Sequence, residues 1–285
     1  RNGGEYYTPR PLITTIVNVV APKVGETIYD GAVGSAGFLC EAFEYLKQSK
    51  ELTTDDVETL QKRTFYGKEK KSLAYVIGIM NMILHGVEAP NIIHTNTLAE
   101  NLVDIQEKDR FDVVLANPPF GGIVANNNET NFPQTYRTKE SADLFLILMI
   151  HLLKQDGRAG IVLPDGSLTG DGVKQRIRQR LLEECNLHTI IRLPNSVFQP
   201  YATVATNLLF FDKGKPTKDI WYYEHRMPEG YKAYNKTRPI QAKEFEPITK
   251  WWNNRTESDI AWKVNIKTII ERGYDLDIKN PTKAE

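Results

Sequence analysis

The 285-residue sequence is 41% hydrophobic and 25% charged, so it can bury one large α/β core or form two small domains. Its 36 basic and 36 acidic residues cancel, which excludes a chain that holds a phosphate backbone by charge alone. Its cysteines, Cys40 and Cys185, lack metal-ligand spacing and favour a reducing compartment. No signal peptide or apolar run of spanning length is apparent. Because the first residue is arginine rather than methionine, we expect a fragment of a longer protein.

The first predicted helix begins near Pro11, after a polar segment led by glycines. Apolar residues recur at helical spacing from Leu12 to Val20, and proline is well tolerated at the start of a helix. Taken alone, the preceding Tyr6-Tyr7-Thr8-Pro9 segment is typical of an arm packed on the core.

A strand, a glycine-rich turn and a helix follow, which together form the first βα unit of a nucleotide-binding sheet. The strand spans residues 27–30, and glycines recur at Gly31, Gly34 and Gly37. Such glycines let the backbone approach a ligand closely at a helix N-terminus. Their spacing differs from the G-x-G-x-x-G of dinucleotide enzymes. Because Asp30 at the strand end would repel a pyrophosphate, the turn predicts a cationic or amine-bearing ligand.

The second strand, residues 64–69, ends in an acidic residue. A carboxylate there can accept hydrogen bonds from both hydroxyls of a ribose, which is the role predicted for Glu69. In isolation, a surface glutamate in a charged run is an equal alternative. The next helix ends at Gly86, and we expect its apolar face to lie in the core. That face consists of Leu73, Val76, Ile77, Met80 and Leu84.

The motif around which the chain is organised comes after two further strands. Residues 91–98 form the third strand and its turn, and residues 112–116 form a strand buried on both faces. This strand stops after Asn117, because neither Pro118 nor Pro119 can donate a ladder hydrogen bond. In an open α/β sheet, ligands bind at this carboxyl edge.

Four residues at this edge suit a planar group that carries an NH2. The Oδ1 atom of Asn117 and the carbonyl of Pro118 can accept its two N–H bonds, while Phe120 stacks on its face. The alternative is a strand that happens to end in two prolines before a loop.

The remaining elements complete an alternating α/β pattern. Residues 123–140 are polar and unpatterned, which is typical of a lid or of disorder, and we favour a lid over the target. Beyond residue 213 the composition shifts to Lys, Trp, Tyr and Pro. Lys174, Arg176, Arg178 and Arg180 form two stripes on one helix, so we expect that helix to be solvated. The other predicted elements are a helix at 142–153 and strands at 158–164, 189–193 and 206–211.

Several motifs together resemble one known family. Asn117-Pro118-Pro119-Phe120 resembles the catalytic motif of the amino-methyltransferases that modify adenine N6 in DNA. Residues 4–10 resemble the segment that opens the catalytic region of type I modification subunits, and residues 276–281 resemble their tail. Residues 30–39 are similar to the family's glycine turn, with Gly31 where proline is usual. The motif order matches the γ arrangement of DNA amino-methyltransferases.

The resemblance implies a fold, a cofactor and a set of site residues. The fold is a Rossmann-like α/β methyltransferase with a seven-stranded, mostly parallel sheet, a reversed last strand and helices on both faces. The cofactor is S-adenosylmethionine, and no metal is expected. Cofactor contacts are expected from Glu5, Tyr6, Tyr7, Thr8, Pro9, Arg10, Asp30, Gly34, Ser35, Ala36, Glu69, Asn96 and Thr97. Catalytic residues are expected to be Asn117, Pro118, Pro119 and Phe120, and contacts with the target base Phe120, Tyr136 and Phe198.

The resemblance also implies an organisation and partners. Residues 1–213 are expected to form the catalytic domain, with residues 1–22 as its cofactor-binding segment. Residues 214–285 are expected to pack on that core or to contact partner subunits. The expected partners are double-stranded DNA with a flipped adenine, a specificity subunit, a restriction (endonuclease and translocase) subunit and a second modification subunit. A prokaryotic cytoplasm is the expected location, with no membrane partner.

Two alternatives remain at this point. The NH2 group could belong to a protein glutamine or to an RNA base, although such enzymes usually lack this N-terminal region and tail. The chain could also be a non-catalytic scaffold of the same fold, against which the intact Asn117, Pro118 and Phe120 argue.

Overall fold

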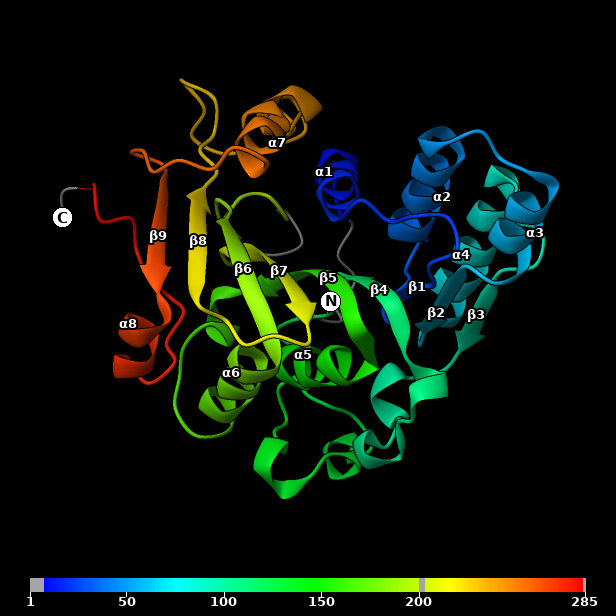
Figure 1. Cartoon of the computed structure of the whole chain (residues 1–285), viewed down its shortest axis with the longest axis horizontal. Coiled ribbons are helices and arrows are strands. Elements are labelled where there is room, and N and C mark those ends of the chain that lie inside the picture. The colour runs from blue at the N-terminus through cyan, green and yellow to red at the C-terminus, as the bar shows by residue number, and fades with distance from the viewer. Residues whose placement is uncertain (1–7, 200–202, 284–285) are drawn as a thin grey trace.

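The computed structural model describes residues 8–199 and 203–283, in which a single β-sheet carries helices on both faces (Figure 1). The strands are β1 (Ile28–Asp30), β2 (Phe65–Glu69), β3 (Asn91–His94), β4 (Phe111–Ala116), β5 (Leu153–Pro164), β6 (Cys185–Arg192), β7 (Thr206–Lys213), β8 (Asp219–Glu224) and β9 (Ala261–Asn265). Their order across the sheet is β3-β2-β1-β4-β5-β7-β6-β8-β9. β1 to β5 are parallel, and β7 runs antiparallel between β5 and β6. This mostly parallel sheet with a reversed β7 confirms the predicted fold class.

The central strands are buried because helices cover both faces of the sheet. Residues 113–116 of β4 and residues 206–211 of β7 are all buried, as expected for near-continuous apolar runs in such a sheet. β1, β2 and β4 are adjacent and parallel, so their carboxyl ends lie at the same edge.

The predicted count of seven strands was wrong, because the 9-stranded sheet also contains β8 and β9. β8 pairs with β6 in parallel, and β9 pairs with β8 antiparallel. Both lie beyond residue 213, where few aliphatic residues mark a strand. Aromatic rings provide the burial instead, since the rings of Tyr222 and Trp262 stack with centroids 5.5 Å apart. These two strands therefore extend the same sheet.

The helices divide between the two faces (Figure 1). One face carries α1 (Arg10–Val20), α2 (Gly37–Ser49), α3 (Thr54–Lys62), α4 (Ser72–His85) and α7 (Glu246–Trp252). The other face carries α5 (Ser141–Leu152), α6 (Val173–Glu184) and α8 (Ile266–Glu271). Every residue of α5 except His151 is buried, so this helix is the centre of its core. Within the described part of the chain, none of the helices combines the length and apolarity needed to cross a bilayer.

The predicted burial of the apolar face of α4 was wrong. Leu73 is 73% exposed, Met80 56% and Leu84 79%, and Val76 and Ile77 are also exposed. In α4 the buried residues are Gly78 and Met82. Helical spacing identifies which residues share a face, but it does not say which face meets the sheet. α4 therefore carries an outer face, defined by Leu73, Val76, Met80 and Leu84 together with Ile83 (49% exposed).

The prediction that the basic helix α6 is solvated was wrong for Arg178, which is 1% exposed. Its Nε donates to the Tyr274 carbonyl at 2.7 Å, and its Nη2 donates to the Gly170 carbonyl at 2.6 Å. Burial lowers the pKa of this guanidinium. Arg178 therefore anchors the C-terminal segment, here residues 274–278, to the core.

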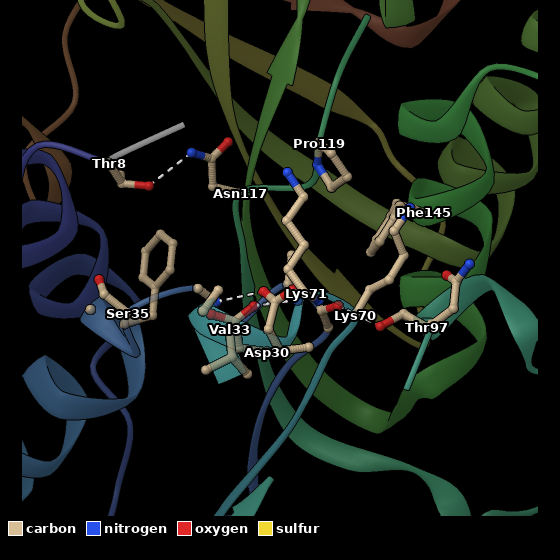
Figure 2. Close-up of a pocket in the computed structure, with 18 of the residues that line it drawn as sticks. Thr8, Asp30, Val33, Ser35, Lys70, Lys71, Thr97, Asn117, Pro119 and Phe145 are labelled. Atoms are coloured by element: carbon tan, nitrogen blue, oxygen red, sulfur yellow. Dashed lines mark hydrogen bonds between the residues drawn. The ribbon is translucent and has the colours of Figure 1, made fainter. Parts of the chain in front are cut away.

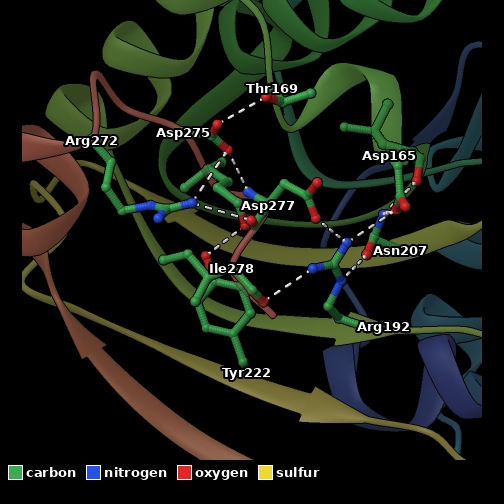
Figure 3. A network of polar contacts seen from close by, with 11 residues as sticks. Asp165, Thr169, Arg192, Asn207, Tyr222, Arg272, Asp275, Asp277 and Ile278 are labelled. Carbon is green, nitrogen blue, oxygen red and sulfur yellow. Dashed lines mark hydrogen bonds and ion pairs between the residues drawn. The ribbon is translucent and has the colours of Figure 1, made fainter. Parts of the chain in front are cut away.

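A second arginine fixes the same segment from β6 (Figure 3). The Nη2 atom of Arg192 lies 2.6 Å from Asp277 Oδ1 and 3.2 Å from Asp165 Oδ1, and its Nη1 donates to the Ile278 carbonyl at 3.0 Å. Tyr222 adds a 2.8 Å bond from its hydroxyl to the Leu276 carbonyl. Because Asp165 directly follows β5, this network ties the C-terminal segment to the carboxyl end of that strand.

Candidate active site

A cavity of about 650 Å³ lies at the carboxyl edge of the sheet. Asp30 is the last residue of β1, Glu69 is the last residue of β2, and Asn117 directly follows β4. Asn96 follows β3 after a single residue. All four line the cavity, so segments distant in sequence converge on one space, part of which Figure 2 shows.

The structure brings together most, but not all, of the predicted site residues. Lining the cavity are Thr8, Arg10, Asp30, Gly34, Ser35, Glu69, Asn96, Thr97, Asn117 and Pro119. Outside its lining are Pro9, Ala36, Pro118, Phe120, Tyr136 and Phe198. Glu5, Tyr6 and Tyr7 lie outside the described residues. The roles predicted for these three residues, like those of the other predicted site residues, stay predictions.

The glycine turn, residues 31–36, forms one wall and is braced by Glu69. Gly34 has a φ of 54° and Ala36 a φ of 66°, both in the left-handed region. Glu69 Oε1 accepts a hydrogen bond from the Gly34 amide at 2.9 Å, and its Oε2 accepts one from the Lys71 amide at 2.8 Å. Each carboxylate oxygen has further acceptor capacity, so Glu69 can brace the turn and still accept from a ligand hydroxyl.

Asp30 is a buried carboxyl with one oxygen unpaired. It is 1% exposed, and its Oδ1 accepts from the Ala32 amide at 2.8 Å. Its Oδ2 has no hydrogen-bond partner among the described residues. Burial, opposed by the Ala32 hydrogen bond and assisted by the charge of Glu69, raises the pKa of Asp30 to about 7. A cation or an N–H donor at Oδ2 would supply the missing partner and favour the ionised form.

Asn96 and Thr97 shape the next part of the wall. Asn96 Oδ1 accepts from the Leu98 amide at 3.0 Å, which caps the short 3₁₀ turn at Thr97–Ala99. The Thr97 hydroxyl donates to the carbonyl of Gly31. Thr97 thus ties the loop after β3 to the glycine turn.

In the Asn117 side chain, the amide nitrogen makes a hydrogen bond within the described part of the chain and the amide oxygen does not. Its Nδ2 donates to the Thr8 hydroxyl at 2.8 Å, as Figure 2 shows. Its Oδ1 is buried and has no donor among the described residues. Thr8 was predicted only as a cofactor contact, and its bond to the catalytic motif was not foreseen. The Asn117 side chain therefore has an acceptor oxygen with no partner among the described residues.

The three residues predicted to contact the base do not form one group. Phe120 and Phe198 are each 2% exposed and meet edge to face, with ring centroids 6.1 Å apart. Because both rings are almost fully buried, a base can stack on either ring only after the residues that cover it move. Tyr136 lies elsewhere, beside Arg180.

The loop after the motif contributes to the cavity wall. Gly122, Ile123, Val124 and Ala125 line the cavity, and a β-bridge between Ile123 and Glu140 closes the base of the loop. The loop also contains 3₁₀ turns at Asn128–Asn131 and Gln134–Tyr136. These contacts give the loop a defined course along the cavity wall, and its role as a lid over the target stays a prediction.

Sequence reasoning missed the contribution of α4 to the site. Ala74, Ile77, Asn81 and His85 line the cavity, although the helix was assigned to the core. A signal was present, because residues 72–85 contain no charged residue, and Asn81 interrupts an apolar run. Gly31 and Gly37 of the predicted glycine turn also line the cavity. The other lining residues that were not predicted are Ile13, Ala32, Val33, Phe38, Cys40, Lys70, Lys71, Leu98, Ser141 and Phe145.

Comparison with curated proteins finds relatives along the whole chain. The methylase subunit of the type I restriction enzyme EcoEI from Escherichia coli is 50% identical over 292 residues, covering 100% of this chain and 59% of that protein. The EcoKI methylase subunit from E. coli K12 is 33% identical, covering 92% of this chain and 52% of that protein. The chain thus spans little more than half the length of these relatives.

Solved structures and a family model agree with these relatives. A modification subunit from Vibrio vulnificus YJ016 matches with a TM-score of 0.94 and 46% identity, covering 98% of this chain and 60% of that one. The EcoKI M protein matches with a TM-score of 0.85 and 27% identity, covering 99% and 68%. The model of the N-6 DNA Methylase family matches residues 1–285. The chain belongs to the N-6 DNA methylase family.

Proposed function

We propose that the chain is the catalytic part of an enzyme that transfers a methyl group from S-adenosylmethionine to N6 of adenine in DNA. The observation that carries this proposal is the buried Oδ1 of Asn117, which has no donor among the described residues. Buried acceptors are normally paired, and a substrate NH2 group is the donor that this one needs. The relatives named as type I methylase subunits support the same activity.

The cavity fits S-adenosylmethionine by its set of donors and acceptors. Asp30 has a free oxygen for the amine or the positively charged sulfur of the cofactor, and Glu69 has acceptor capacity for the ribose hydroxyls. Asn96 is assigned to the edge of the cofactor adenine. A volume of about 650 Å³ suits a ligand of this size.

The residues of the chain act by positioning and electrostatics. When bound, S-adenosylmethionine supplies a methyl group on a positively charged sulfur. The target adenine leaves the duplex at a cost of roughly a few kcal/mol. The contact between Phe120 and Phe198 then opens so that the adenine can stack on an aromatic ring. Asn117 Oδ1 and the Pro118 carbonyl then accept hydrogen bonds from N6, which favours a pyramidal nitrogen with a usable lone pair. Because Thr8 fixes the Asn117 amide, the acceptor is oriented before the base arrives.

We further propose that this chain works with partner subunits. A net charge of zero gives little attraction to phosphates, so a specificity subunit would supply DNA grip and sequence choice. A restriction subunit and a second modification subunit would complete the assembly, as the type I names of the relatives suggest.

Residues 1–213 remain our proposed catalytic domain, and residues 214–285 its extension. Because the named relatives come from Escherichia coli, the location we propose is a prokaryotic cytoplasm.

The deciding experiment offers three substrates to the full-length protein with its partner subunits. Methyl-labelled S-adenosylmethionine is incubated with adenine-containing DNA, with RNA and with protein, for the wild type and for Asn117→Ala. Transfer to DNA adenine that Asn117→Ala slows by roughly 100-fold or more is the expected result. Transfer to RNA or to protein glutamine, but not to DNA, would establish the other planar NH2 substrate. Failure of the wild type to bind S-adenosylmethionine would establish a scaffold.

A further inference from the structure

The glycine turn holds a backbone conformation that the surrounding structure must maintain. Ala36 lies at a φ of 66°, a region that residues with a side chain rarely adopt, and Gly34 lies at 54°. Strained conformations of this kind persist only where neighbouring groups fix them. The groups that fix this turn come mainly from β2 and α4.

Two residues of α4 meet successive carbonyls of the turn. Asn81 Nδ2 donates to the Ser35 carbonyl at 2.8 Å. Gly78 lies three residues earlier on the same face, where a Cβ atom would stand 2.7 Å from the Gly34 carbonyl oxygen. Such a distance is too short for any side chain, so only glycine lets α4 approach the turn this closely.

Glu69 completes the arrangement by accepting from the Gly34 amide. Three successive peptide units, from Val33 to Ala36, are therefore contacted from the β2–α4 side. Each contact is to backbone, so it controls the course of the turn and not merely the side chains on it.

We propose that Gly78 and Asn81 are positioning residues that keep the glycine turn in its ligand-binding conformation. The inference rests on the proposed cofactor site, since it assigns to α4 the task of shaping that site. Displacing the Gly34 or Ser35 carbonyl moves the Gly34 amide away from Glu69 and alters the cavity wall. Cofactor affinity is then lost, while Asn117 and the chemistry of the NH2 group are untouched.

Gly78→Ala is the sharpest test, because glycine has no side chain that could contact a ligand. Alanine has a higher helix propensity than glycine, but its Cβ cannot fit beside the Gly34 carbonyl unless the turn or α4 shifts. We expect calorimetry on the full-length protein to show S-adenosylmethionine binding at least tenfold weaker. Thermal unfolding should show a folded protein with at most a modest loss of stability from the displaced turn, and single-turnover methylation at saturating cofactor should stay within about twofold.

Asn81 provides an independent arm. Asn81→Leu keeps the approximate volume without a donor and should weaken binding about tenfold, while Asn81→Gln keeps a donor and should recover part of the affinity. Met80→Ala, on the outer face of α4 and 56% exposed in the wild type, is the matched control and should bind normally.

The outcomes separate the two proposals. Wild-type affinity in both Gly78→Ala and Asn81→Leu would overturn the positioning role while leaving the cofactor site intact. A wild-type protein that does not bind S-adenosylmethionine would instead refute the proposed function.

Discussion

Thr8 and Asn117 are 109 residues apart in the sequence, yet the Asn117 Nδ2 donates to the Thr8 Oγ1 at 2.8 Å. The bond joins the segment before α1 to the Asn-Pro-Pro-Phe turn after β4. It also fixes the orientation of the Asn117 amide, whose buried oxygen then remains available as an acceptor. Thr8 therefore contacts the Asn117 side chain and also lines the cavity.

Thr8→Val removes the hydroxyl that orients Asn117 while keeping the shape of the side chain. We expect single-turnover methylation to slow by roughly five- to tenfold, which corresponds to about 1–1.5 kcal/mol for a hydrogen bond. Thr8→Ser keeps the hydroxyl and should stay near the wild-type rate. Equal rates for the valine and wild-type proteins would show that the bond does not orient the amide.

Asn117→Ala should act on chemistry and not on cofactor affinity. By analogy with the loss of one oxyanion-hole donor, methyl transfer should slow by roughly 100-fold or more. Asn117→Asp keeps an acceptor and should retain more activity than alanine. Single-turnover assays with partner subunits, beside calorimetry, measure both quantities. Loss of cofactor binding with an unchanged rate at saturating cofactor would contradict the assignment.

Glu69→Ala should weaken S-adenosylmethionine by at least roughly 1.5–3 kcal/mol, the range for hydrogen bonds to a charged group. The structure adds a reason, because the substitution also frees the Gly34 and Lys71 amides that this carboxylate braces. Glu69→Gln keeps one acceptor and should fall between alanine and wild type. Unchanged affinity in calorimetry would remove Glu69 from the site.

Asp30 should make cofactor affinity depend on pH. With a pKa of about 7 in the folded protein, Asp30 is mostly protonated at pH 6 and mostly ionised at pH 8. A cationic ligand favours the ionised form, so affinity should rise roughly tenfold between these pH values and then level off. Calorimetry at several pH values measures this, and Asp30→Asn should show a flat profile. A wild-type profile as flat as that of the variant would exclude Asp30.

Asp30 should also make the stability of the fold depend on pH, in a direction set by its raised pKa. The folded-state pKa of Asp30 is raised above its ordinary value of 3.8, so the fold favours the protonated form. This contribution to stability is complete below about pH 4 and is lost as pH rises to about 7. Asp30→Asn stays neutral and should become more stable than the wild type above pH 7. Urea unfolding between pH 4 and 8 would reveal the crossing of the two curves.

Local patterns were sufficient to predict the first seven strands and the convergence of Asp30, Glu69 and Asn117. Most of these strands are short apolar runs that end at or near glycine, an acid or proline, although β3 ends at His94, and parallel order places the ends of β1, β2 and β4 together. β8 and β9 were not predicted, because their burial depends on partner strands and on aromatic rings such as that of Tyr222. Aromatic rings also occur on protein surfaces, so they do not identify a buried strand.

The Thr8–Asn117 and Asn81–Ser35 contacts could not be predicted, because each joins two segments whose relative placement only the folded chain determines. The orientation of α4 failed for a related reason. Its apolar period was recognised correctly, but Gly78, which has no side chain to contribute to a hydrophobic pattern, decides which side approaches the core.

The outer face of α4 affects how the 285-residue chain should behave in concentrated solution. The sequence pI is about 7.1, so copies carry almost no net charge at neutral pH and do not repel one another. Residues 72–85 also lack any charged side chain that could keep two such helices apart. Colloidal stability should therefore be lowest near pH 7 and improve when the buffer moves away from it. A single Leu84→Lys substitution should also improve colloidal stability at pH 7, and light scattering would measure the change.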